Sequence, residues 1–128
     1  MILVDSSVWV RALRRGDSPE SRELDALLSA DEVAITDIVV AEVLQGASSE
    51  TEFASFAERM DALHYFHADE ALWLRAARLS FDLKRQGTTT SLADAVIAAV
   101  ALENSLELYT LDSDFQRIPG LSLYQVRT

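Results

Sequence analysis

The stretch Ile2-Leu3-Val4-Asp5-Ser6-Ser7 decides how this chain folds. Its first three side chains are apolar, which is typical of a short strand that is buried on both faces of a parallel sheet. Asp5, Ser6 and Ser7 follow directly, and short polar side chains of this kind cap the N-terminus of a helix. We therefore expect a strand that ends at Asp5 and leads at once into a helix over about residues 7–15.

The same alternation of apolar strands and capped helices continues along the chain. Ser18-Pro19-Glu20 has the signature of a helix start, with proline at the first helical position. Strands that alternate with helices predict an α/β sandwich, with a central parallel sheet of about five short strands flanked by helices. The further expected strands are 33–36, 63–66, 106–109 and 121–125, and the further helices are 18–28, 38–44, 50–62, 69–87 and 91–103, with a short turn of helix over 112–117.

Length and composition favour one domain over residues 1–128. The chain is 49% hydrophobic and long enough for a single core. It has no cysteine, which excludes disulfides and thiolate chemistry, and neither a leader nor a membrane span is evident, so we expect a cytoplasmic protein. Its net charge of −10 argues against binding of nucleic acid by a broad basic surface. That charge does not exclude a nuclease whose acids bind metal.

Several acidic side chains stand where strands end or helices begin. In parallel α/β folds, ligands bind outside the carboxyl ends of the strands. Each acid also has a purely structural interpretation, as a helix cap, a solvated carboxylate, half of a capping box or a partner of the helix dipole. The acids are Asp5 after the first strand, Glu42 inside the apolar helix 38–44, Asp94 three residues after Ser91 at a helix start, and Asp112 with Asp114 after strand 106–109.

The combination of these acids indicates a metal site. If the sheet is parallel, they converge on one edge, and carboxylates within about 5 Å of one another repel strongly. Such a cluster needs protons or cations, and oxygen ligands without cysteine or suitably spaced histidine select Mg²⁺, or Mn²⁺ as a substitute, over zinc. An acidic pocket that holds one or two such ions is typical of enzymes that cleave phosphodiester bonds with metal-activated water.

Four segments of the chain resemble, in the right order, the four motifs of PIN domains. Within that family the chain is most similar to the VapC toxins of bacterial type II toxin–antitoxin (VapBC) pairs. The resemblance spans the whole chain, and four linked motifs are far more specific than any one of them. The segments are Ile2-Leu3-Val4-Asp5-Ser6-Ser7, Val40-Ala41-Glu42-Val43-Leu44-Gln45-Gly46, Leu92-Ala93-Asp94-Ala95-Val96-Ile97-Ala98 and Tyr109-Thr110-Leu111-Asp112-Ser113-Asp114-Phe115.

The resemblance implies a PIN-like three-layer sandwich and a Mg²⁺-dependent endoribonuclease that cleaves structured RNA (tRNA, rRNA or mRNA). It also implies a homodimer and inhibition by a cognate VapB-type antitoxin, whose C-terminal segment occupies the groove. Ser6 and Thr110 match hydroxyl positions that orient the pocket. By the same resemblance the catalytic and metal-binding acids are Asp5 and Asp94, then Glu42 and Asp112, with Asp114 as an accessory metal ligand.

The expected mechanism is hydrolysis by water bound to Mg²⁺, which Asp5 and Asp94 hold. Arg11, Arg14 and Arg15 follow the Asp5 loop, where they contact flanking phosphates in one interpretation. In the other, they form a solvated face that interacts with the C-terminal end of the helix dipole. The sequence leaves both interpretations open.

Two other classes of protein also place an aspartate after a first strand. A magnesium-dependent phosphatase of the haloacid dehalogenase type has a second aspartate two residues on and a later lysine, whereas this chain has Ser7 there and a sole lysine, Lys84, at the end of a long helix. A receiver-like acidic module, which binds rather than cleaves, needs a lysine after the fifth strand, for which Arg127 is a poor substitute. Both remain alternatives to the nuclease.

Overall fold

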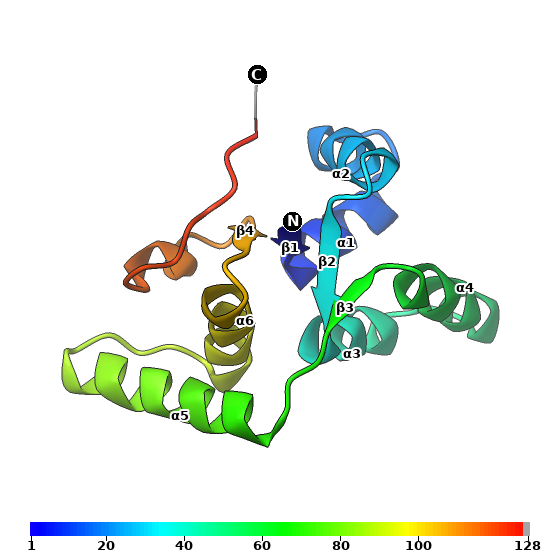
Figure 1. The fold of residues 1–128 in the computed structure, drawn as a ribbon. Helices are drawn as coiled ribbons and strands as arrows, with labels where there is room; N and C mark the ends of the chain where they lie inside the picture. Colours follow the sequence, from blue (N-terminus) through cyan, green and yellow to red (C-terminus); the bar gives the residue numbers. More distant parts are fainter. Residues whose placement is uncertain (127–128) are drawn as a thin grey trace.

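The chain's structure is a computed structural model that describes residues 1–126. Over that part of the chain, four strands form one parallel sheet in the order β3-β2-β1-β4, surrounded by helices (Figure 1). This confirms the predicted α/β architecture. The elements are β1 Ile2–Val4, α1 Ser6–Arg14, α2 Pro19–Ser29, β2 Val33–Thr36, α3 Asp37–Gln45, α4 Glu50–Asp61, β3 His64–Phe66, α5 Glu70–Arg85, α6 Leu92–Glu103, β4 Glu107–Tyr109 and the 3₁₀ helix η1 Ser113–Arg117.

Local sequence signals explain where the helices begin. The Asp5 side chain accepts a hydrogen bond from the Ser6 backbone N–H at 2.8 Å, so it caps α1 as predicted. Ser18 and Ser91 cap α2 and α6 in the same way, by accepting from the backbone N–H three residues on. The observed boundaries therefore lie close to those expected from the sequence.

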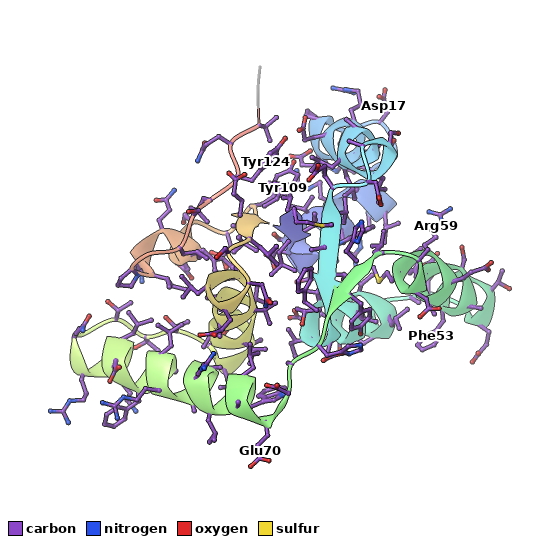
Figure 2. The ribbon with its side chains drawn as sticks, in the orientation of Figure 1. Asp17, Phe53, Arg59, Glu70, Tyr109 and Tyr124 are labelled. Atoms are coloured by element: carbon purple, nitrogen blue, oxygen red, sulfur yellow. The ribbon has the colours of Figure 1, made fainter. Side chains whose placement is uncertain are left out.

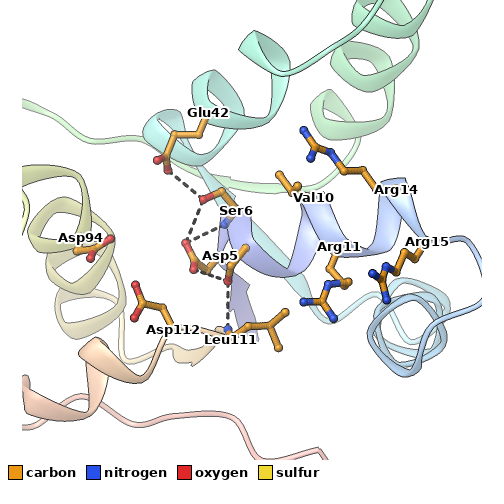
Figure 3. Close-up of a pocket in the computed structure, with 11 residues that line it drawn as sticks. Asp5, Ser6, Val10, Arg11, Arg14, Arg15, Glu42, Asp94, Leu111 and Asp112 are labelled. Atoms are coloured by element: carbon orange, nitrogen blue, oxygen red, sulfur yellow. Dashed lines mark hydrogen bonds between the residues drawn. The ribbon is translucent and has the colours of Figure 1, made fainter.

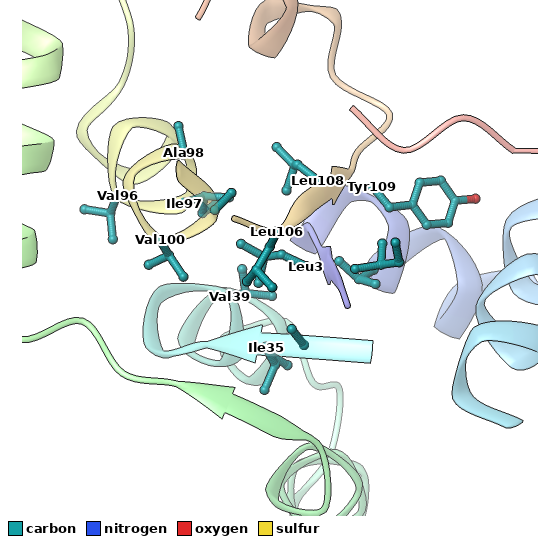
Figure 4. Packing of buried hydrophobic residues seen from close by; sticks show 14 of the residues in the cluster. Leu3, Ile35, Val39, Val96, Ile97, Ala98, Val100, Leu106, Leu108 and Tyr109 are labelled. Atoms are coloured by element: carbon teal, nitrogen blue, oxygen red, sulfur yellow. The ribbon is translucent and has the colours of Figure 1, made fainter. Parts of the chain in front are cut away.

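The core forms where β1 lies at the centre of the sheet. Ile2, Leu3 and Val4 are buried on both faces, β1 pairs with β2 on one side and with β4 on the other, and α6 packs its apolar side chains nearby (Figure 4). The register pairs Val4 with Tyr109. The residues that follow these two, Asp5 and Thr110, therefore lie side by side at the carboxyl edge of the sheet.

The predicted fifth strand over 121–125 is wrong in extent. Residue Leu123 forms a single parallel bridge to Leu108, with the Tyr124 N–H donating to the Leu108 carbonyl at 2.8 Å. Pairing stops there because the Tyr124 ring lies against Tyr109 and its hydroxyl donates to Glu23 of α2, which draws the segment toward α2 (Figure 2). The sheet therefore has four strands and one bridge in place of about five strands.

Candidate active site

Asp5 is the most tightly held carboxylate at the carboxyl edge of the sheet. The residue is only 4% exposed. Oδ1 accepts from the Ser6 N–H, and Oδ2 accepts from the Ser7 hydroxyl at 2.7 Å and from the Thr110 hydroxyl at 2.8 Å. A buried carboxylate is costly unless it is hydrogen-bonded, and these three donors supply the bonds. The position and orientation of Asp5 are therefore fixed by its neighbours.

The hydroxyl groups around Asp5 also organise the loop that follows β4. Thr110 Oγ1 accepts from the Asp112 N–H at 3.0 Å, and Ser7 Oγ accepts from the Leu111 N–H at 3.1 Å. The two hydroxyls thus bind both Asp5 and the chain that carries Asp112. Thr110 was expected in this role, whereas Ser7 was not: the only signal for it was a second hydroxyl two residues after Asp5.

Glu42 faces Asp5 from the middle of α3. The Ser6 hydroxyl donates to Glu42 Oε1 at 3.2 Å and also lies 3.4 Å from Asp5 Oδ1, so one hydroxyl stands between the two carboxylates. Burial raises the pKa of Glu42, and the charges of Asp5 and Asp94 raise it further, although the hydrogen bond from Ser6 opposes this. Glu42 is half-buried, so it is not a fully solvated carboxylate on the helix surface.

Asp94 lies in the first turn of α6 and faces the same region. Its backbone N–H donates to the Ser91 hydroxyl at 3.1 Å, which is the capping interaction that the sequence predicts. Burial raises the pKa of the Asp94 carboxyl, and the charges of Asp112 and Asp5 add to the rise. The capping role belongs to Ser91 and the Asp94 backbone, so the Asp94 side chain remains directed at the other acids.

Asp112 and Asp114 have different surroundings. Asp112 Oδ1 accepts from the Asp114 N–H at 2.9 Å, so this carboxylate caps η1 while it lines the same pocket as Asp5. Asp114 is exposed, lies 3.5 Å from Arg117 and lines a separate small pocket beside Asp94. The structure therefore places Asp112 in the pocket with the other acids, whereas Asp114 lies outside it, in a second pocket that Asp94 also lines.

Asp5, Glu42, Asp94 and Asp112 line one pocket of about 660 Å³ (Figure 3). Asp5 and the first residues of α1 form its centre, with acids from three other parts of the chain on one side and basic side chains from the end of α1 on the other. The charged lining residues are Asp5, Glu42, Asp94, Asp112, Arg11, Arg14 and Arg15. The sequence predicted every one of these residues as a candidate.

The donor set of this pocket fits a hard divalent cation. All four acids offer carboxylate oxygens, the ligands that such ions prefer. Burial first, and then the charges of neighbouring acids, raise the pKa of Glu42 and Asp94, so a bound cation would offset a charge that the site disfavours. Within residues 1–126, no three His, Asp or Glu side chains stand close enough to enclose one ion. Binding therefore requires the helix-borne side chains to turn inward.

The phosphatase and the receiver-like module each require a lysine near the acidic pocket, and the described residues place none there. Lys84 lies in the last turn of α5 and is not among the residues that line the acidic pocket. Arg127, the weak substitute in a receiver-like module, lies outside the described residues. His64 and His67 contact Asp31 and Asp37, away from the pocket. In addition, no helix in the described part of the chain is long and apolar enough to span a membrane.

Comparison with known proteins identifies the family. The PIN domain family model matches residues 2–121. Ribonuclease VapC11 of Mycobacterium tuberculosis is 30% identical over 129 residues, covering 98% of this chain and 96% of the relative. VapBC2 of Rickettsia felis, bound to a promoter DNA fragment, has a chain with a TM-score of 0.79 and 25% identity that covers 97% of this chain and 98% of its own. DNA-bound VapBC of Salmonella typhimurium shares the fold, with a TM-score of 0.82, 21% identity and 96% of each chain covered. The chain therefore belongs to the PIN domain family and, within it, to the VapC ribonucleases.

Proposed function

We propose that this chain is the toxin of a VapBC toxin–antitoxin pair and that it cleaves structured cellular RNA at the acidic pocket, with Mg²⁺ as the cofactor. The observation that carries the proposal is the meeting of Asp5, Glu42, Asp94 and Asp112 in one pocket, in a chain that belongs to a ribonuclease family. We propose these four residues as the catalytic and metal-binding set. Asp114 is proposed only as an accessory acid, because it lines a different pocket.

Each residue of the proposed site has a distinct task. When bound, Mg²⁺ lowers the pKa of a coordinated water and offsets the charge of the phosphate. Asp5 would provide a ligand that is already oriented, because the hydroxyls of Ser7 and Thr110 donate to its Oδ2. Glu42 from α3, Asp94 from α6 and Asp112 from the loop after β4 would complete the ligand set, and Ser6 orients Glu42. The arginines at the end of α1 attract the RNA backbone to a pocket that is otherwise negatively charged.

We infer an antitoxin of the VapB type as the partner that controls this activity. The inference is supported by family membership and by the likeness to VapBC of Rickettsia felis, whose description names a complex bound to promoter DNA. A net charge of −10 is complementary to a basic partner segment. We further propose that residues 1–128 form a single PIN domain, that the protein acts in the cytoplasm, where its RNA substrates are found, and that it forms a homodimer.

Induced expression in a bacterial host tests the proposed function. We expect growth arrest with the wild-type chain, relief by Asp94→Asn, and new RNA 5′ ends in sequencing after a short induction. Asp17→Asn is the matched control, because Asp17 is a fully exposed acid outside the pocket, and it should arrest growth like the wild type. Unimpaired growth and an unchanged set of RNA ends, with the wild-type protein present in the cells, would favour the receiver-like binding module instead.

A further inference from the structure

A second pocket, of about 420 Å³, adjoins the acidic pocket and lies between α1, α3 and α4. The two pockets share Val10 and Arg14, so they lie next to each other along α1. We call the second one the α1–α4 pocket. Its apolar lining comes from all three helices and consists of Val10, Leu13, Val43 and Phe56.

Arg14 lies at the junction of the two pockets and has no charged partner among the described residues. Arg11, one turn earlier, lies 3.7 Å from Glu20 on the α2 side of the helix. In Figure 3, Arg11 and Arg15 extend to that side, whereas Arg14 extends to the side of α3 and α4. Within residues 1–126, Arg14 forms no salt bridge and no side-chain hydrogen bond. A free guanidinium is suited to a phosphodiester, which it can bind through two N–H groups.

The rim of the α1–α4 pocket carries hydrogen-bonding groups. Glu52 Oε1 accepts from the Ser48 backbone N–H at 3.1 Å, which fixes the carboxylate at the start of α4. Among the described residues, the second oxygen of Glu52 and the Ser48 hydroxyl have no hydrogen-bond partner. An apolar floor with a few polar groups on its rim suits a nucleobase, which has flat apolar faces and polar edges. The Glu52 charge repels phosphate, which keeps the RNA backbone on the Arg14 side.

We propose that the α1–α4 pocket binds the base of an unpaired nucleotide that flanks the scissile phosphate, while Arg14 binds the phosphate of that nucleotide. Arg14 lies nine positions after Asp5, roughly 14 Å along the axis of α1, so this nucleotide is distinct from the one that is cut. The pocket thereby favours RNA with an unpaired base near the cleavage point. This inference rests on the proposed function and adds a substrate-binding subsite to it.

Two variants separate the contact with the phosphate from the contact with the base. Arg14→Ala removes the cation, and Ser48→Phe fills the pocket from an exposed position without altering the core. The matched controls are Arg22→Ala on α2, where the arginine pairs with Asp17, and Ser29→Phe at the exposed end of α2. The probe is a fluorescein-labelled 12-nucleotide single-stranded RNA of mixed sequence. Binding is measured by fluorescence anisotropy with Mg²⁺ on the Asp5→Asn background, which leaves the probe uncut.

Both variants should weaken binding, by different routes. Arg14→Ala should raise the Kd about fivefold and lower the slope of log Kd against log salt concentration by about 0.7, since one phosphate contact is lost. Ser48→Phe should raise the Kd about tenfold with an unchanged salt slope, since a base and not a charge is excluded. On a probe whose nucleotides are all abasic, Ser48→Phe should cause no loss of affinity. Neither control should change the Kd.

The failure of this inference is distinct from the failure of the proposed function. If the wild-type chain cleaves RNA but Ser48→Phe leaves the Kd for the probe unchanged, the subsite is refuted and the ribonuclease stands. The same holds if Ser48→Phe weakens only the binding of an antitoxin peptide, because the pocket then belongs to a protein partner. If the wild-type chain cleaves no RNA, the proposed function itself is refuted, and the subsite with it. Melting temperatures of all variants verify that each is folded.

Discussion

Asp5 and the acids that face it from the helices occupy two different environments in one pocket. Asp5 is buried, and hydrogen bonds from Ser6, Ser7 and Thr110 stabilise its charge. Glu42 and Asp94 are half-buried, and burial together with neighbouring charges raises the pKa of each. The difference shows which part of the site is formed in advance: the hydrogen bonds fix Asp5 in place, and we call it the anchor of the site. The charges of Glu42 and Asp94 are disfavoured by their surroundings, so a cation or a proton would stabilise these two residues.

The largest effect should come from removing the anchor. Asp5→Asn should reduce RNA cleavage by more than about 100-fold, beyond the range usual for residues that only orient a metal ligand. It should also lower the melting temperature without metal, because an amide cannot accept all the hydrogen bonds that now reach the carboxylate. A cleavage assay with purified protein and thermal unfolding measure the two effects. Activity equal to wild type would remove Asp5 from the site.

Glu42→Gln and Asp94→Asn should change the melting temperature in the opposite direction. Each should reduce cleavage by about 100-fold, the upper end of the range for residues that only orient a ligand, since a proposed ligand is lost while Asp5 remains in place. Each should nevertheless raise the melting temperature in EDTA at neutral pH, because a charge that its surroundings disfavour is removed. If both variants melted below the wild type in EDTA, the charges of Glu42 and Asp94 would stabilise the fold as that of Asp5 does, and the contrast between them and Asp5 would be wrong.

Metal and pH should act on the helix-borne acids together. Because the folded-state pKa of Glu42 and Asp94 is raised, these groups favour folding when protonated, and this contribution is lost as the pH rises from the unfolded pKa through the folded one. Mg²⁺ should therefore raise the melting temperature most at about pH 8 and least at about pH 5, where protons compete with the ion. Calorimetric scans with Mg²⁺ and with EDTA measure this, and an increment that is constant with pH would count against metal binding by these two acids.

A smaller loss should follow when the support of the anchor is weakened. Thr110→Val keeps the shape of the side chain but removes the hydroxyl that donates to Asp5 and accepts from the Asp112 N–H. We expect about a tenfold loss of Mg²⁺ affinity and of cleavage, as is common when a residue that orients a ligand is removed. Thr51→Val, on the exposed start of α4, is the control. Unchanged Mg²⁺ affinity in Thr110→Val would show that Ser6 and Ser7 suffice to orient Asp5.

The smallest effect should come from Asp114. This residue is exposed, pairs with Arg117 and lies in a separate pocket, so Asp114→Asn should alter cleavage by less than about threefold. Steady-state cleavage rates at two salt concentrations test this. A loss as large as that of Asp94→Asn would place Asp114 among the ligands and would mean that the ion lies on the far side of Asp94.

Local signals made much of the fold predictable. Asp5, Ser18 and Ser91 cap helices through bonds to residues one to three positions away, so the sequence alone contains the interaction. The apolar run of β1 and the apolar helix α6 are predictable because burial on all sides leaves little room for polar side chains. Long-range pairing was less predictable: residues 121–125 have the composition of a strand, but Tyr124 makes contacts with β4 and α2 that limit the pairing to one bridge.

The sequence by itself predicted the type of chemistry, because four carboxylates at or near strand ends and helix starts, in a chain without cysteine, favour a metal site with oxygen ligands. Only the tertiary structure decided how these acids differ. The parallel pairing of β1 with β4 brings Thr110 to Asp5 across 105 positions of sequence, and the packing of α1 on α3 brings Ser6 to Glu42. The bond from the Leu111 N–H to Ser7, the exclusion of Asp114 from the main pocket and the pocket beside Arg14 also depend on contacts between distant segments. Hydrogen bonds and electrostatic shifts act over a few ångströms in space, whereas a sequence records only the order of residues along the chain.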